Sequence, residues 1–158
     1  MNLYQRLIVA VDGSPAAHAG LRAAISLAQE QQARLKILAV ADEASGSYGG
    51  AELGWLNNEG LNARLKGDAE RLLDEAAALA AAAGLEPERE LVEAPDGQIA
   101  RHITEAAAAW QADLIVVGTH GRHGLMRWLM GSTTEALLRE LKLPLLVVPC
   151  AHTKASGA

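Results

Sequence analysis

The fold of this chain is decided by a stretch near its amino terminus, Arg6-Leu7-Ile8-Val9-Ala10-Val11-Asp12-Gly13-Ser14-Pro15. Residues 6–11 form a short, apolar and β-branched run, which predicts a strand buried on both faces, as in a parallel sheet. The next residues end the strand and begin a helix, because Ser14 is a good N-cap and Pro15 suits the first helical position. A buried strand followed at once by a helix is typical of an α/β fold.

The same alternation continues along the chain. Further strand-like runs lie at 34–40, 88–93, 113–117 and 143–149. Apolar residues recur at helical spacing in the segments 15–32, 61–83 and 99–110, and a final helix is expected from Gly131 or Ser132 onward. We therefore predict a single-domain open parallel sheet of five strands with helices on both faces.

The long helix in the segment 61–83 is expected to bury one stripe of apolar side chains. This stripe consists of Leu61, Leu65, Ala69, Leu72, Ala76, Leu79 and Ala83. Gly84 stands where a helix C-cap belongs, and Pro87 follows just beyond it. The strand at 88–93 is dense in charge, which suits an edge of the sheet.

A length of 158 residues indicates one domain. We place this domain at 1–150 and a frayed tail at 151–158. Residues 42–60 break the alternation with a glycine-rich stretch that carries Tyr48 and Trp55. We expect a flexible loop insertion there, which either covers a ligand or has no fixed structure, and the sequence leaves both open.

The composition argues against several classes of function. The formal net charge is −5, whereas nucleic-acid binders carry basic surfaces, so no nucleic-acid partner is expected. The single cysteine, Cys150, excludes an internal disulfide framework and a site built from several thiolates. No apolar run is long enough to cross a bilayer, and the amino terminus lacks the layout of a signal peptide. We expect a soluble, cytoplasmic protein with no membrane partner.

The residues that carry chemistry follow the strand at 113–117. The segment 118–134 contains two arginines, two histidines and no acidic residue, in a chain of negative net charge. Its glycines let backbone N–H groups approach an anion, and the helix that follows adds free donors and a favourable dipole. The order of strand, glycine-rich loop and helix favours phosphate binding, although glycine content alone would favour ordinary turns. The segment is not a Walker-type loop, and the dinucleotide fingerprint is absent after the first strand, which argues against NAD and FAD.

The spacing of the glycines has a parallel in a known family. Gly118-x-x-Gly121, nine further residues and then Gly131-Ser132 resemble the nucleotide-binding signature of the universal stress protein family, in its ATP-binding branch. The resemblance covers nearly the whole chain. Residues 8–14 resemble the family's first strand and turn, 113–121 its fourth strand and loop, and 144–149 its closing strand. Three segments in the right order are far more specific than the glycines alone.

The resemblance implies the strand order 3-2-1-4-5, a Rossmann-like sheet of the adenine nucleotide alpha hydrolase type. In this order the tips of strands one and four, which carry Asp12 and Gly118, flank the switch point where ligands bind. By similarity, Asp12 and the backbone of Ala10 and Val11 meet the ribose and adenine, and Val40 lines the adenine pocket. The expected nucleotide-binding residues are Ala10, Val11, Asp12, Val40, Val117, Gly118, Thr119, His120, Gly121, Arg122, Gly131, Ser132, Thr133 and Thr134.

The expected cofactor is ATP. A Mg or Mn ion that accompanied it would be held mainly by the phosphates, because the sequence offers no cluster of metal ligands. No catalytic residue is assigned: His120 has no carboxylate partner or nucleophile at a working spacing, and Asp12 and Glu135 are the nearest carboxylates. We therefore predict a nucleotide-dependent regulatory or stress-response protein with at most weak ATP hydrolysis and an unknown protein partner. The alternatives are a slow ATPase or a nucleotidyl or phosphoryl transferase, and a structural dimer module without a ligand.

The closing strand predicts a partner of a second kind. In the order 3-2-1-4-5 it lies at an edge of the sheet, and residues 144–149 are uniformly apolar. An exposed apolar edge invites aggregation, and the same strand of a second copy would cover it. We predict a homodimer through residues 144–149, which the family resemblance also implies.

Overall fold

The computed structural model describes residues 2–41, 58–119, 136–137 and 139–149. Five parallel strands form one sheet in the order β3-β2-β1-β4-β5. The strands are β1 (Arg6–Val11), β2 (Arg34–Ala41), β3 (Glu88–Glu93), β4 (Leu114–Thr119) and β5 (Leu145–Pro149). The helices are α1 (Pro15–Gln31), α3 (Asn58–Ala82) and α4 (Ile99–Trp110). The predicted fold class and strand order are confirmed.

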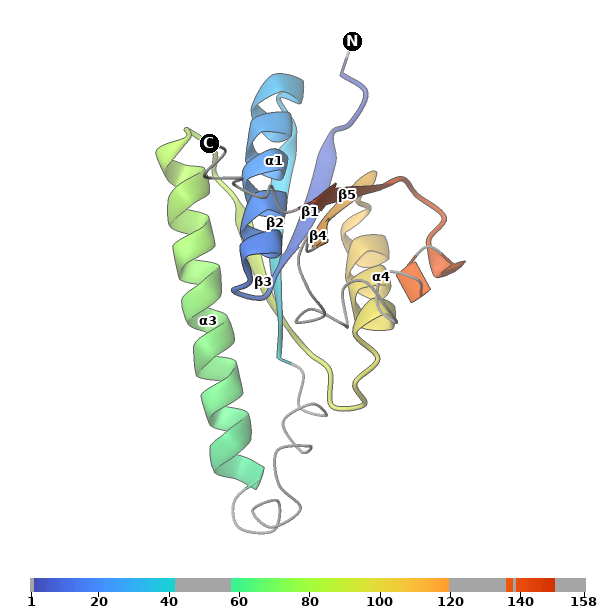
Figure 1. Cartoon of the computed structure of the whole chain (residues 1–158). Coiled ribbons are helices and arrows are strands. Elements are labelled where there is room, and N and C mark those ends of the chain that lie inside the picture. Colours follow the sequence, from blue (N-terminus) through green and yellow to red (C-terminus); the bar gives the residue numbers. More distant parts are fainter. Residues whose placement is uncertain (1, 42–57, 120–135, 138, 150–158) are drawn as a thin grey trace, which may run out of the picture.

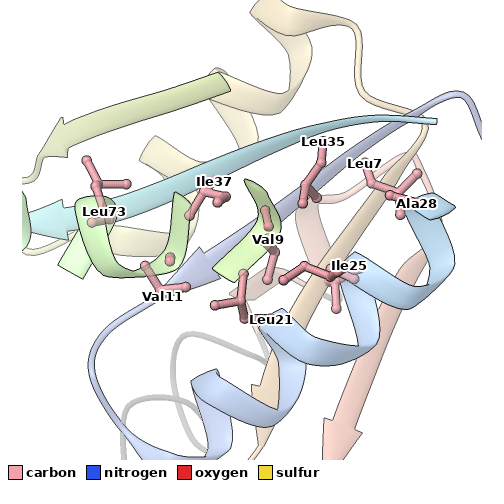
Figure 2. Packing of buried hydrophobic residues seen from close by; sticks show 14 of the residues in the cluster. Leu7, Val9, Val11, Leu21, Ile25, Ala28, Leu35, Ile37 and Leu73 are labelled. Carbon is pink, nitrogen blue, oxygen red and sulfur yellow. The ribbon is translucent and has the colours of Figure 1, made fainter. Parts of the chain in front are cut away.

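Helices cover both faces of the sheet because its strands bury alternate side chains on opposite sides (Figure 1). Leu7, Val9 and Val11 of β1 face α1 and α3 and join one apolar cluster, which Figure 2 shows from close by. Ile8 of β1 points the other way, into a second cluster with α4 and Leu137. The central strands are therefore buried on both faces, as their continuous apolar sequences predict.

The helix ends follow the expected local chemistry. Ser14 caps α1, and its Oγ accepts a hydrogen bond from the backbone N–H of Ala17 at 3.0 Å. Gly84 lies beyond the end of α3 with φ +89°, the left-handed conformation that a C-terminal glycine favours. Gln32 and Gln111 take the same conformation after α1 and α4, although neither is a glycine.

The stripe predicted for α3 is partly wrong. The helix buries Ala69, Leu73, Ala76 and Ala80. Leu72 is only half-buried, and Leu79 is 43% exposed. The buried stripe shares Ala69 and Ala76 with the predicted one but includes Leu73 and Ala80. The helix is rich in alanine, so its sequence is compatible with more than one apolar stripe.

The segment predicted as a loop, 42–60, overlaps the start of this helix. α3 begins at Asn58, so the last three residues of the segment are helical. Residues 42–57 lie outside the described residues. None of the helices in the described ranges is long and apolar enough to cross a membrane.

The two edges of the sheet differ in charge, as predicted. β3 carries ion pairs on both of its faces, because Glu90 pairs with Lys36 at 2.6 Å while Arg89 pairs with Asp74 of α3. β5 carries no charged residue, and Leu146 on it is 38% exposed. A charged edge resists pairing with another chain, whereas an apolar edge does not.

Candidate functional site

Several predicted site residues lie together at the carboxyl ends of the parallel strands. Ala10 and Val11 end β1, Asp12 follows them, Val40 lies near the end of β2, and residues 117–119 end β4. β1 and β4 are neighbours although they are far apart in the sequence. This is the point where the strand order reverses, and open α/β sheets bind ligands there.

The tips of β1 and β4 extend beyond their mutual pairing. Their parallel register runs from Leu7 opposite Leu114 to Val9 opposite Val116. β1 nevertheless continues to Val11 and β4 to Thr119. The last residues of both strands are therefore free of each other at this edge.

The turn after β1 fixes Asp12 in place. Its carboxylate oxygen Oδ1 accepts a hydrogen bond from the backbone N–H of Ser14 at 2.9 Å. Gly13, between them, has φ +82°, which an L side chain rarely adopts. Asp12 is half-buried, and within the described part of the chain no hydrogen bond engages its other oxygen, Oδ2. That oxygen can accept hydrogen bonds from hydroxyl groups such as those of a ribose.

Gly118 is constrained by packing as well as by its place at the tip of β4. It is buried, and a Cβ built on it would lie 1.9 Å from the carbonyl oxygen of Ala16 in α1. No side chain can be accommodated at that distance. The sequence interpretation, which gave Gly118 a role in holding a nucleotide, did not detect this packing requirement.

The remaining predicted residues cannot be placed. His120, Gly121, Arg122, Gly131, Ser132, Thr133 and Thr134 lie outside the described residues. Thr119 ends β4 and is the last residue described before them. The structure therefore brings together the expected adenine and ribose side of the site and reaches the start of the expected phosphate side.

A second polar cluster at the same edge was missed by the sequence interpretation. Asp96, between β3 and α4, accepts hydrogen bonds from the backbone N–H of Gln98 at 3.0 Å and from Nε2 of His102 at 2.9 Å. Arg101 pairs with its other oxygen. The Gln98 hydrogen bond, followed by that of His102, lowers the pKa of Asp96 below its ordinary value. The sequence signal for the cluster is an aspartate before a helix, followed five and six residues later by arginine and histidine.

The surroundings of this cluster include an open hollow. A space of about 280 Å³ separates the start of α4 from the helical residues Ala136 and Glu140. On the α4 side, this hollow is lined by residues 97–101. Asp96 is satisfied by three partners, so the cluster fixes the start of α4 and offers no free carboxylate for proton transfer.

The titratable side chains near the tips of β1 and β4 come from the turn after β1 and from the helices α1 and α3. Among the described residues at the tips of these strands, Asp12 is the single carboxylate, while His18 of α1 and Glu75 of α3 line a hollow of about 180 Å³ together with Gly13 and Ser14. General acid–base chemistry needs a side chain within hydrogen-bond reach of the proton that it moves, and nucleophilic chemistry needs an activated nucleophile. Asp12 is held by Ser14 at the tip of β1, and its carboxylate can accept hydrogen bonds from a ligand there.

Comparisons with known proteins agree with this geometry. The model of the universal stress protein family matches residues 3–149. A universal stress protein of Methanocaldococcus jannaschii is 33% identical over 147 residues, which cover 93% of this chain and 83% of that protein. A universal stress protein of Bacillus subtilis is 31% identical over 150 residues, which cover 92% of this chain and 99% of that protein.

A solved structure shares both fold and sequence with the chain. A protein of the universal stress protein family from Burkholderia pseudomallei superposes with a TM-score of 0.75 at 30% identity. The match covers 94% of this chain and 98% of that one. The order of strands and the extent of these matches lead to one conclusion: the chain belongs to the universal stress protein family.

Proposed function

We propose that this chain binds ATP at the tips of β1 and β4, and that the bound nucleotide controls a regulatory role in a stress response without efficient catalysis. The observation that carries the proposal is the Asp12 turn. Oδ1 of Asp12 is held by Ser14, while Oδ2 accepts no hydrogen bond from the described residues and lies where the strand order reverses. A carboxylate in this position is suited to the two hydroxyl groups of a ribose.

Two relatives with the same fold support an adenine nucleotide as the ligand. One universal stress protein has been solved in complex with cAMP, with a TM-score of 0.65 and 24% identity to this chain. Another, from Archaeoglobus fulgidus, has been solved in complex with dAMP, with a TM-score of 0.61 and 18% identity. Both ligands combine adenine, a ribose or deoxyribose and phosphate, which are the parts that ATP would present here.

The parts of ATP can be assigned to the described residues and to the segment that follows. Asp12 and the backbone of Ala10 and Val11 would hold the ribose and adenine, and Val40 would line the adenine pocket. The phosphates would lie along the segment 118–134, whose arginines, hydroxyl groups and glycines suit an anion. A Mg or Mn ion would be held mainly by the phosphate oxygens, and the described residues hold no cluster of three or more metal-ligating side chains.

The proposal includes a second copy of the chain as a partner. Leu146 is exposed on the apolar edge strand β5, and pairing of residues 144–149 with the same strand of another copy would cover it. We further propose that the protein works in the cytoplasm, where ATP is abundant.

The first experiment tests for the ligand itself. The purified protein is denatured, released nucleotide is identified by chromatography and mass spectrometry, and the apo form is titrated with ATP, ADP and AMP. We expect ATP binding, with turnover near background. A protein that releases no nucleotide and binds none contradicts the proposal, whereas clear turnover that Asp12→Ala abolishes would make the chain an enzyme.

Two variants test the site. Asp12→Asn keeps the oxygen that Ser14 holds but replaces Oδ2 by a donor, so the affinity for ATP should fall by about tenfold or more. Asp68→Asn, on the exposed face of α3, is the matched control and should bind as the wild type does. Gly131→Val should abolish binding without unfolding the protein, and unchanged affinity would show that the segment 118–134 does not hold the phosphates.

A further inference from the structure

The close contact between α1 and β4 involves a glycine that no ligand motif contains. Gly20 lies in the interior of α1, where glycine destabilises a helix relative to alanine. It is buried. A buried glycine inside a helix indicates that a neighbouring element packs too closely for a side chain.

The neighbour that packs closely against Gly20 is the backbone of β4. A Cβ built on Gly20 would lie 3.0 Å from the backbone nitrogen of Gly118 and 3.3 Å from the carbonyl carbon of Val117. One turn further toward the start of the helix, the carbonyl oxygen of Ala16 meets Gly118 from the same side. A full turn of α1 therefore lies directly against the peptide unit that joins Val117 to Gly118.

The same turn of α1 is connected to Asp12 by two hydrogen bonds. The N–H of Ala17 donates to Oγ of Ser14 at 3.0 Å, and the N–H of Ser14 donates to Oδ1 of Asp12 at 2.9 Å. A continuous series of short contacts thus runs from the tip of β4 through the start of α1 to the tip of β1. Among the described residues, the register of β1 and β4 ends at Val9 and Val116, so beyond that pair this series of contacts links the two tips.

We infer that Gly20 is a positioning residue for the nucleotide site: by letting α1 lie against β4, it sets the distance between Asp12 and Gly118. This inference rests on the proposed function, in which Asp12 serves the ribose and Gly118 begins the phosphate side of the site. A ligand that spans both tips depends on their spacing, whereas a ligand that uses one tip does not. Small errors in spacing are costly for a ligand held at two points.

The test substitutes Gly20→Ala, which adds only a Cβ. Its contacts at 3.0 and 3.3 Å are with backbone atoms that cannot rotate away, so α1 must move by a few tenths of an ångström. We expect the dissociation constant for ATP to rise by about fivefold or more, and that for adenosine by less than about twofold. Both are measured by isothermal titration calorimetry on the full chain, and thermal melting verifies the fold.

The matched control is Gly67→Ala, inside α3. An added Cβ meets no atom of the described residues within 4 Å there, so the variant should bind ATP and adenosine as the wild type does. Unchanged ATP affinity in Gly20→Ala, or an equal loss for ATP and adenosine, overturns the inference while leaving the proposed function intact. A wild-type chain that binds no ATP overturns both.

Hydrogen exchange on the wild type provides a second readout that needs no variant. Because the start of α1 connects the two tips, bound ATP should slow amide exchange in residues 16–20 as well as in residues 117–119. Adenosine should slow exchange near Asp12 with a smaller effect on residues 117–119. ATP binding that leaves residues 16–20 unchanged contradicts the inference even if Gly20→Ala fails to fold.

Discussion

The backbone of Gly118 lies against the carbonyl oxygen of Ala16, at a distance that leaves no room for a Cβ between them. This contact joins α1 to β4 where the family resemblance expects a phosphate-binding glycine. Gly118 therefore has a packing role of its own. Loss of ligand binding on its substitution would not by itself identify a ligand contact.

Gly118→Ala should destabilise the protein. A Cβ that lies 1.9 Å from Ala16 O forces α1 away from β4, which should lower the free energy of unfolding by about 1–3 kcal/mol or more. Gly67→Ala, which has no described atom within 4 Å of the added Cβ, should instead raise the free energy of unfolding by up to about 1 kcal/mol. Urea denaturation of the two variants measures both, and a Gly118→Ala variant as stable as the wild type would show that α1 does not press on β4.

The left-handed residue after α4 offers a stabilising change. Gln111 has φ +59°, a conformation that costs about 1 kcal/mol or more for a residue with a Cβ. Gln111→Gly should therefore raise the free energy of unfolding by about 0.5–1 kcal/mol. Gly84→Ala makes the opposite change at φ +89°, where the added Cβ meets no described atom within 4 Å, and should lower the free energy of unfolding by a similar amount. Thermal melts that shift in the same direction for both variants would refute the explanation.

Asp96 should make stability depend on pH in acid. Its pKa in the folded state lies below that of an unfolded aspartate, about 3.9, because Gln98 and His102 hydrogen-bond to the charged carboxylate. The stabilisation is therefore complete above the unfolded pKa and is lost as the pH falls through the lower folded pKa.

The corresponding variant is Asp96→Asn. It should be less stable than the wild type near neutral pH, and the difference should shrink as the pH falls below about 4. Asp68→Asn on α3 measures the general effect of removing an exposed carboxylate. Chemical denaturation at a series of pH values gives the comparison, and a difference between Asp96→Asn and the wild type that grows in acid has the wrong sign for this account.

The edge strand β5 gives a prediction on assembly. Leu146→Lys places a charge on the apolar edge and should convert a dimer of the wild type to monomers at micromolar concentration. Leu79→Lys is the control, because Leu79 is similarly exposed but lies on α3. Analytical ultracentrifugation reports both states, and a wild-type monomer at micromolar concentration rules out the proposed interface.

The parts of the fold that the sequence predicts well are those with strong local signals. The runs that become β1 and β4 are apolar and β-branched, and Ser14, Pro15 and Gly84 mark helix ends by chemistry that acts within a few residues. The strand order could not be predicted in this way, because hydrophobic periodicity does not show which strands are neighbours. It came from the resemblance to a family.

The failures have an equally physical cause. In α3 an alanine-rich sequence allows more than one apolar stripe, so Leu79 was expected inside and Leu73 was overlooked. The role of Gly20 and the cluster around Asp96 depend on how close separate elements approach in three dimensions. The spacing of apolar residues within one helix does not show how close that helix lies to another element.

The difference between the two sheet edges bears on how many copies can assemble. β3 is lined by ion pairs such as that between Lys36 and Glu90, while β5 is apolar. In a pair joined through β5, the two apolar edges are used against each other, and both outer margins of the combined sheet are copies of β3. Growth by strand addition would then stop at two chains, and the charges on β3 would oppose fibre formation in addition to their local ion pairing.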